Sequence, residues 1–113
     1  MHELAITQSM FELVMEQAKK AGAKKVGKIN LVIGEMTGVV GDCVQFYFNL
    51  ISQGTLVEGA ALSFVMVPPK AQCQRCDKLF DLKEFDWTCP GCGGNSLQLV
   101  AGKELFVESI EVE

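Results

Sequence analysis

Apolar side chains recur at helical spacing over the first part of the chain. Between Leu4 and Ala21 the apolar positions repeat at intervals of three and four residues: Ile6, Met10, Leu13, Val14, Ala18 and Ala21. Glu12, Glu16 and Lys19 occupy the other faces. This pattern predicts an amphipathic helix that ends at Gly22 and turns its apolar stripe toward a core.

Three segments have the pattern of β-strands. The first is residues 28–34, where apolar and polar residues alternate, and the second is residues 61–67, which Pro68-Pro69 follows. The third is residues 104–113, with alternation near the end of the chain. Because two strands alone make a poor sheet, we expect the third strand to join the first two.

A second helix is predicted between the first two strands. Asp42 followed by Gln45 resembles a capping box, and the helix is expected to end near Gly54. Its apolar residues are Val44, Phe46, Tyr47, Phe48, Leu50 and Ile51. The order of elements predicts an α/β (α+β) fold, in which two helices pack against a small three-stranded sheet.

The composition changes between the second and third strands. Residues 70–98 contain four of the five cysteines and few aliphatic residues. We therefore expect an inserted lobe, with residues 1–69 plus 103–113 forming an α/β domain and residues 70–102 forming a ribbon domain.

Length, charge and hydropathy restrict the possible functions. A length of 113 residues suits one domain with a small appendage, and the net charge of -4 argues against a main role on nucleic acid or anionic lipid. No apolar run approaches the roughly 18 residues of a membrane span, and the N-terminus does not resemble a signal peptide. We expect a cytoplasmic protein with no nucleic-acid partner and no membrane partner.

The lobe contains the strongest motif of the sequence. Its cysteines have the spacing C-x2-C-x12-C-x2-C: Cys73, Cys76, Cys89 and Cys92. In a reducing compartment this spacing is typical of a tetrahedral zinc site, and four protein ligands leave no open position for substrate. The sequence therefore predicts a structural Zn(II) site, although thiolate ligands alone do not distinguish zinc from iron.

The charges of the lobe argue against a nucleic-acid partner. Zinc ribbons also occur in proteins that bind nucleic acids, but here basic and acidic residues balance, which leaves no positive surface for phosphates: Lys70, Arg75, Lys78 and Lys83 against Asp77, Asp81, Glu84 and Asp86. The fifth cysteine, Cys43, is expected to be a small buried hydrophobic residue, and we assign it no role.

The only histidine is His2, within Met1-His2-Glu3. A histidine near the end of a chain is usually exposed to solvent and has no specific function. However, a free α-amine, main-chain amide nitrogens and the imidazole of residue two can together chelate one ion, and such nitrogen ligands favour square-planar Ni(II) or Cu(II). No nucleophile–base pair or phosphate-binding loop accompanies this segment, so we do not expect an enzyme.

Taken together, the N-terminal "MHE", the helix–strand–helix–strand body and the "CQRC…CPGC" insert resemble the HypA family over essentially the whole chain. The resemblance implies a nickel metallochaperone for maturation of [NiFe]-hydrogenase. It places transient Ni(II) on Met1, His2 and Glu3, and structural Zn(II) on the four cysteines. It also implies two partners, a nickel-handling GTPase of the maturation pathway and the hydrogenase large subunit precursor. The alternative is a zinc-ribbon adaptor that binds protein or nucleic acid and has no nickel role.

Overall fold

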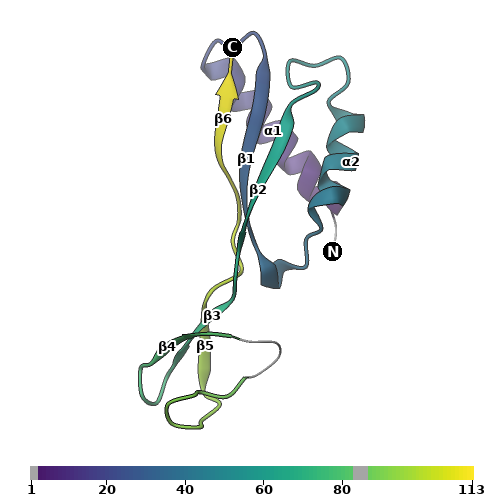
Figure 1. Ribbon diagram of the computed structural model, residues 1–113. Coiled ribbons are helices and arrows are strands. Elements are labelled where there is room, and N and C mark those ends of the chain that lie inside the picture. The colour runs from purple at the N-terminus through teal and green to yellow at the C-terminus, as the bar shows by residue number, and fades with distance from the viewer. Residues whose placement is uncertain (1–2, 83–86) are drawn as a thin grey trace.

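The computed structural model describes residues 3–82 and 87–113, which form an elongated molecule of 55 × 24 × 17 Å (Figure 1). Its elements, in chain order, are α1 (Glu3–Lys20), β1 (Val26–Gly34), the short 3-10 helix η1 (Glu35–Thr37), α2 (Gly41–Ile51), β2 (Ala61–Val67), β3 (Lys70–Cys73), β4 (Leu79–Asp81), β5 (Leu97–Ala101) and β6 (Leu105–Val112). No helix among the described residues is both long and apolar enough to cross a membrane.

The body of the molecule is built on a three-stranded sheet with the order β2-β1-β6. β1 lies in the middle, parallel to β2 and antiparallel to β6, so the last strand joins the sheet as expected. Because two parallel strands need a crossover connection, α2 occupies the chain between β1 and β2.

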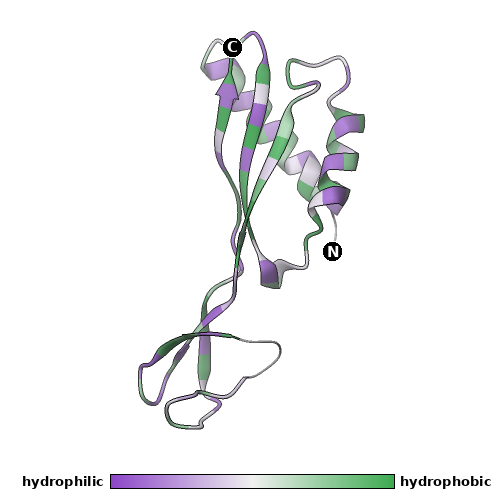
Figure 2. Ribbon diagram, viewed as in Figure 1, coloured by the Kyte–Doolittle hydropathy of each residue, from purple (hydrophilic) through white to green (hydrophobic). Residues whose placement is uncertain are grey.

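The core of the body lies between this sheet and the two helices. Alternate residues of β1, Ile29, Leu31 and Ile33, are buried there. The helices contribute the stripe positions of the sequence pattern: Met10, Val14 and Ala18 from α1, and Val44 and Phe48 from α2. Figure 2 shows the corresponding alternation of hydrophilic and hydrophobic residues along both helices.

Two segments of the chain connect the lobe to the body: one leads from β2 into β3, and the other leads from β5 into β6. The two segments run side by side in Figure 1. It contains a second sheet with the order β4-β3-β5, in which both neighbours of β3 are antiparallel to it. Lobe and body therefore have separate sheets. That residues 70–102 and the rest of the chain behave as separate domains stays a prediction.

Backbone groups pack closely where the lobe meets the body. The N–H of Met36 donates to the carbonyl of Gly102 at 2.8 Å, and the N–H of Gly34 donates to Glu104 at 2.7 Å. A Cβ on Gly34 would overlap the carbonyl group of Gly102, and a Cβ on Gly102 would lie 2.9 Å from the Cα of Pro69. Glycines at these two positions therefore allow the chain to pass from one sheet to the other.

Two expectations about α2 are wrong. The helix begins at Gly41 after the N-cap Val40, so Asp42 is its second residue and does not cap it. Instead of completing a capping box, the Gln45 side chain donates to Asn49 and accepts from the N–H of Leu62. Cys43 is exposed, not buried, because the buried face of the helix passes through Val44 and Phe48.

Candidate metal centre and the N-terminal segment

The first cysteine knuckle is a tight turn at the end of β3. The N–H of Cys73 donates to the carbonyl of Lys78 at 3.0 Å, and the N–H of Asp77 donates to the carbonyl of Cys73 at 2.8 Å. Asp77 has a φ of 62°, a left-handed conformation that Asp tolerates better than most residues. This turn brings the thiols of Cys73 and Cys76 to the same side.

The second knuckle repeats this pattern of hydrogen bonds. The N–H of Cys89 donates to the carbonyl of Gly94 at 2.8 Å, and the N–H of Gly93 donates to the carbonyl of Cys89 at 2.9 Å. Gly93 has a φ of 72° and so takes the place that Asp77 has in the first knuckle. The two knuckles are thus one structural unit used twice.

The knuckles bring the four thiols together. All four Sγ atoms lie within 4.8 Å of one another, and no other group of three or more potential ligands occurs among the described residues. The Sγ atoms of Cys73 and Cys92 are 3.5 Å apart, and so are the Sγ atoms of Cys76 and Cys89. Four sulfurs around one zinc ion, with Zn–S bonds of about 2.3 Å, would be separated by about 3.8 Å. The cluster therefore fits a tetrahedral metal site.

Main-chain hydrogen bonds lower the pKa of two of these thiols. Main-chain hydrogen bonds from Cys76 and Arg75 lower the pKa of Cys73 to about 6. The N–H of Cys92 likewise lowers the pKa of Cys89. Each of these buried thiols is the first cysteine of its knuckle, and a lowered pKa favours the thiolate that a metal requires.

The second cysteine of the first knuckle behaves differently. The N–H of Lys78 lowers the pKa of Cys76, but hydrogen bonding to the Cys89 sulfur, burial and the neighbouring thiols outweigh this and raise it to about 11. Four adjacent thiols cannot all ionise without a cation between them. A bound divalent cation would supply the positive charge that lets all four thiols ionise and coordinate it.

Of the three residues predicted to bind nickel, Met1 and His2 lie outside the described residues. Glu3 is the first residue of α1 and is partly buried. Its carbonyl accepts a hydrogen bond from the Thr7 hydroxyl at 2.6 Å, and its carboxylate accepts one from the N–H of Val40 at 3.3 Å. Glu3 is thereby attached to the start of α2, a contact that no sequence pattern indicated.

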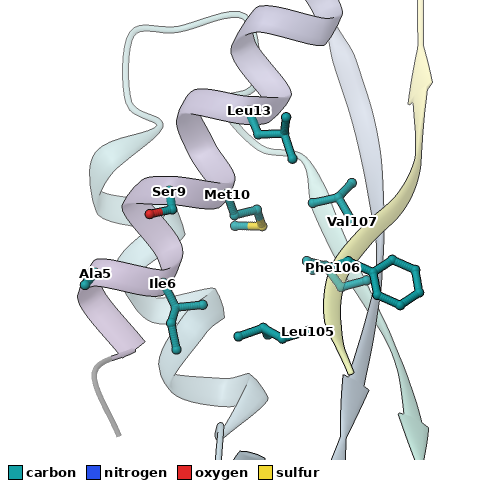
Figure 3. A pocket seen from close by; sticks show the side chains of 9 residues that line it. Ala5, Ile6, Ser9, Met10, Leu13, Leu105, Phe106 and Val107 are labelled. Atoms are coloured by element: carbon teal, nitrogen blue, oxygen red, sulfur yellow. The ribbon is translucent and has the colours of Figure 1, made fainter. Parts of the chain in front are cut away.

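A pocket of about 410 Å³ lies between α1 and β6, near the start of α1 (Figure 3). Side chains of Ile6 and Met10 face Leu105 and Val107 across it, whereas the Phe106 ring points away. The described residues that line it include no imidazole, thiol or carboxylate side chain, so this part of the pocket wall is mainly apolar.

Comparison with protein families places these features in a known context. Residues 1–112 match the family model described as hydrogenase/urease nickel incorporation, metallochaperone, hypA. The chain is 42% identical to the hydrogenase maturation factor HypA of Caldanaerobacter subterraneus subsp. tengcongensis and 40% identical to that of Geobacter metallireducens. Each of these alignments covers 100% of both proteins.

Solved structures agree with this assignment. A HypA protein in solution matches with a TM-score of 0.76 and 26% identity, covering 100% of this chain and 97% of that one. The Ni metallochaperone HypA from Helicobacter pylori matches with a TM-score of 0.69 and 25% identity, covering 99% of this chain and 97% of that one. With the whole sequence, the fold and the cysteine cluster in agreement, the chain belongs to the HypA family of nickel metallochaperones that act in hydrogenase maturation.

Proposed function

We propose that this protein binds Ni(II) at its N-terminus and delivers it during maturation of [NiFe]-hydrogenase, without catalysing a reaction itself. Membership of the HypA family over the whole chain is the observation that carries this proposal. Nickel is cargo in this role, so its site must both hold the ion and release it. An N-terminal chelate suits exchange better than a closed cage does.

The proposed nickel site consists of Met1, His2 and Glu3. The α-amine, the amide nitrogen of His2 and the imidazole of His2 form fused chelate rings around one ion, and the Glu3 amide nitrogen completes a plane. Imidazole and deprotonated amide nitrogens favour Ni(II) in square-planar geometry. Because binding displaces protons, nickel affinity should rise with pH.

The four cysteines have a different role in this proposal. Cys73, Cys76, Cys89 and Cys92 hold one Zn(II) ion, which closes the two knuckles against each other and stabilises the lobe. All four positions of a tetrahedral ion would be filled by protein, so we assign the zinc a structural function. Cysteines that bind a metal instead of forming disulfides suit the reducing cytoplasm, where we expect the protein to act.

We further propose that the partners are the nickel-handling GTPase of the same pathway and the precursor of the hydrogenase large subunit. The family description, which names nickel incorporation, supports partners of this kind. A carrier of exchangeable metal needs a donor or an acceptor that contacts the end of the chain where the metal lies. Both helices begin at the end of the body that faces the lobe (Figure 1), and we propose that a partner contacts the protein at this end.

Nickel titration of protein with a native, untagged N-terminus tests the chelate. We expect native protein to develop the d–d absorption band of square-planar Ni(II). One or two residues added before Met1 move the amine away from His2, and His2→Ala removes the imidazole. Each change should weaken nickel binding at least about tenfold, because each breaks a chelate ring, while zinc content and fold stay unchanged.

The N-terminal extension separates this mechanism from an ordinary surface histidine. If the extended protein binds nickel as tightly as the native one, the terminal chelate is wrong. Salt-sensitive retention on DNA or RNA, together with no nickel uptake, would instead support a zinc-ribbon adaptor.

A further inference from the structure

The two cysteine knuckles differ in the charged side chains that accompany their thiols. The first reads "CQRCDK", with Arg75 between the cysteines and Asp77 and Lys78 directly after them. The second reads "CPGCGG" and contains no charged side chain. The basic groups of the two knuckles therefore come from the first knuckle only.

The side chain of Lys78 lies across the second knuckle. A Cβ added to Gly91 would lie 3.1 Å from the Cδ of Lys78. The same point is 3.7 Å from the Sγ atoms of Cys76 and Cys89. The glycine thus leaves room for the lysine side chain, which passes beside one sulfur of each knuckle.

Arg75 covers the other end of the second knuckle in the same way. A Cβ added to Gly94 would lie 3.2 Å from the Cδ of Arg75 and 3.7 Å from its Nη1 atom. That point is 3.3 Å from the Sγ of Cys92. Arg75 and Lys78, which we call the basic pair, therefore lie beside three of the four sulfurs.

The described residues supply no carboxylate partner for the basic pair. Lys70, at the start of β3, forms an ion pair with Asp81, in which Nζ and Oδ1 are 3.9 Å apart. Neither Arg75 nor Lys78 forms an ion pair with a described residue. Both side chains are exposed, so salt in the solvent screens their charges and they act at short range.

Metal binding changes the charge that the basic pair faces. Four thiolates carry more negative charge than one divalent cation offsets. Because the metal requires every ligand sulfur as a thiolate, further negative charge forms on the sulfurs beside the basic pair. Positive charges at this position therefore stabilise the metal-bound cluster, and groups around metal ligands are known to tune affinity.

We propose that Arg75 and Lys78 are positioning residues of the metal centre, whose side chains cover the second knuckle and whose charges hold the thiolates in the metal-bound arrangement. This inference rests on the proposed Zn(II) site. In it, the four cysteines bind the ion, and the basic pair raises the affinity of the cluster for zinc. A carrier that exchanges nickel needs a lobe whose zinc stays in place.

The test compares Arg75→Met and Lys78→Met, which keep an unbranched apolar side chain and remove the charge. The control Lys70→Met removes an exposed charge of the same lobe, about 10 Å along β3 from Cys73. Zinc affinity is measured by competition with a chelator in about 0.1 M and about 1 M salt, where the Debye lengths are about 10 Å and about 3 Å.

In the lower salt we expect each of the two variants to bind zinc about two- to fivefold more weakly than the native protein, the range of an exposed charge pair. In the higher salt this difference should disappear, because the charges are screened. Lys70→Met should match the native protein in both. Arg75→Lys retains the charge and should bind zinc as tightly as the native protein does.

The salt dependence separates a charge from a packing contact. Native affinity in both methionine variants, or a loss of equal size in both salts, would overturn the proposal, and so would weak binding by Arg75→Lys. Should a methionine variant fail to fold, Arg75→Gln and Lys78→Gln are judged by the same measurements. Metal analysis of the native protein and of Cys92→Ser tests the site itself: a native protein without zinc, or native affinity in Cys92→Ser, would reject the proposed Zn(II) site and the role of the basic pair with it.

Discussion

At the residue scale, one backbone conformation recurs in the two cysteine knuckles. Asp77 and Gly93 occupy equivalent places, both with positive φ, and both donate an N–H to the carbonyl of the first cysteine of their knuckle. Gly adopts this conformation without strain, whereas Asp does so at some cost. The geometry of the thiols thus depends on residues that are not themselves ligands.

This dependence predicts opposite effects of two changes at one position. Asp77→Gly should leave metal retention equal or better, because it relieves the left-handed backbone. Asp77→Val places a β-branched side chain at positive φ and should destabilise the metal-bound knuckle by about 1–2 kcal/mol. Release of zinc to a chelator measures the difference. Equal retention in both variants would contradict a left-handed residue at this position.

Single residues also show what the sequence could and could not reveal. Ligation by two C-x2-C pairs is a local property, so the cluster of Cys73 and its three partners was predictable from spacing alone. The contact between Glu3 and Val40 joins residues far apart in sequence, and no periodicity records it. Cys43 was placed wrongly because a cysteine fits either face of a helix, and only the packing of α2 decides which face is buried.

At the element scale, β1 shows how one strand serves both the core and the lobe junction. β1 ends at Gly34, beside the segment that leads into β6. A Cβ on Gly34 would overlap the backbone of Gly102 and Lys103 in that segment. Gly27, near the start of the same strand, has no positive φ, and a Cβ added to it would meet no atom within 4 Å. The two glycines of this strand therefore differ in what surrounds them.

We predict that Gly34→Ala destabilises the protein by about 1–3 kcal/mol, because backbone cannot move aside as a flexible side chain can. Gly27→Ala is the matched control and should leave the free energy of unfolding within about 0.5 kcal/mol of the native value. Urea unfolding of the two variants measures both quantities. Similar stabilities would mean that the backbone of Gly102 and Lys103, which the added Cβ would meet, shifts readily at the junction.

The elements of the body were largely predictable, because α1 has apolar residues at helical spacing and β1 alternates over Ile29, Leu31 and Ile33. β2 was indicated by a short apolar run that ends at Pro68-Pro69. The ends of α2 were harder to predict from the sequence. Asp42 and Gln45 have capping-box spacing, but the acceptor at this end comes from another helix. The three strands of the lobe were not predicted. Burial alternates along β5, but β3, β4 and β5 have only four, three and five residues, which is too short for a periodic pattern to be recognised in the sequence.

At the scale of the whole molecule, body and lobe are stabilised by different means. The hydrophobic cluster consists entirely of residues from the body. Among the described residues of the lobe, the buried apolar side chains are only Ala71, Cys73 and Cys89. So small a core cannot offset the conformational entropy of the lobe, and metal binding must contribute to its folding.

Loss of the metal should therefore unfold the lobe and spare the body. We predict that Cys92→Ser abolishes tight binding of the proposed zinc ion and collapses the amide NMR signals of β3, β4 and β5 into the unfolded range. Signals of α1, α2 and the β2-β1-β6 sheet should keep their dispersion, because the core of the body contains no metal ligand. Cys43→Ser is the matched control, since it removes an exposed thiol outside the cluster and should retain the zinc and every signal. If Cys92→Ser instead collapses the whole spectrum into that of an unfolded chain, the backbone contacts of Gly34, Met36 and Gly102 couple the two parts into one cooperative unit.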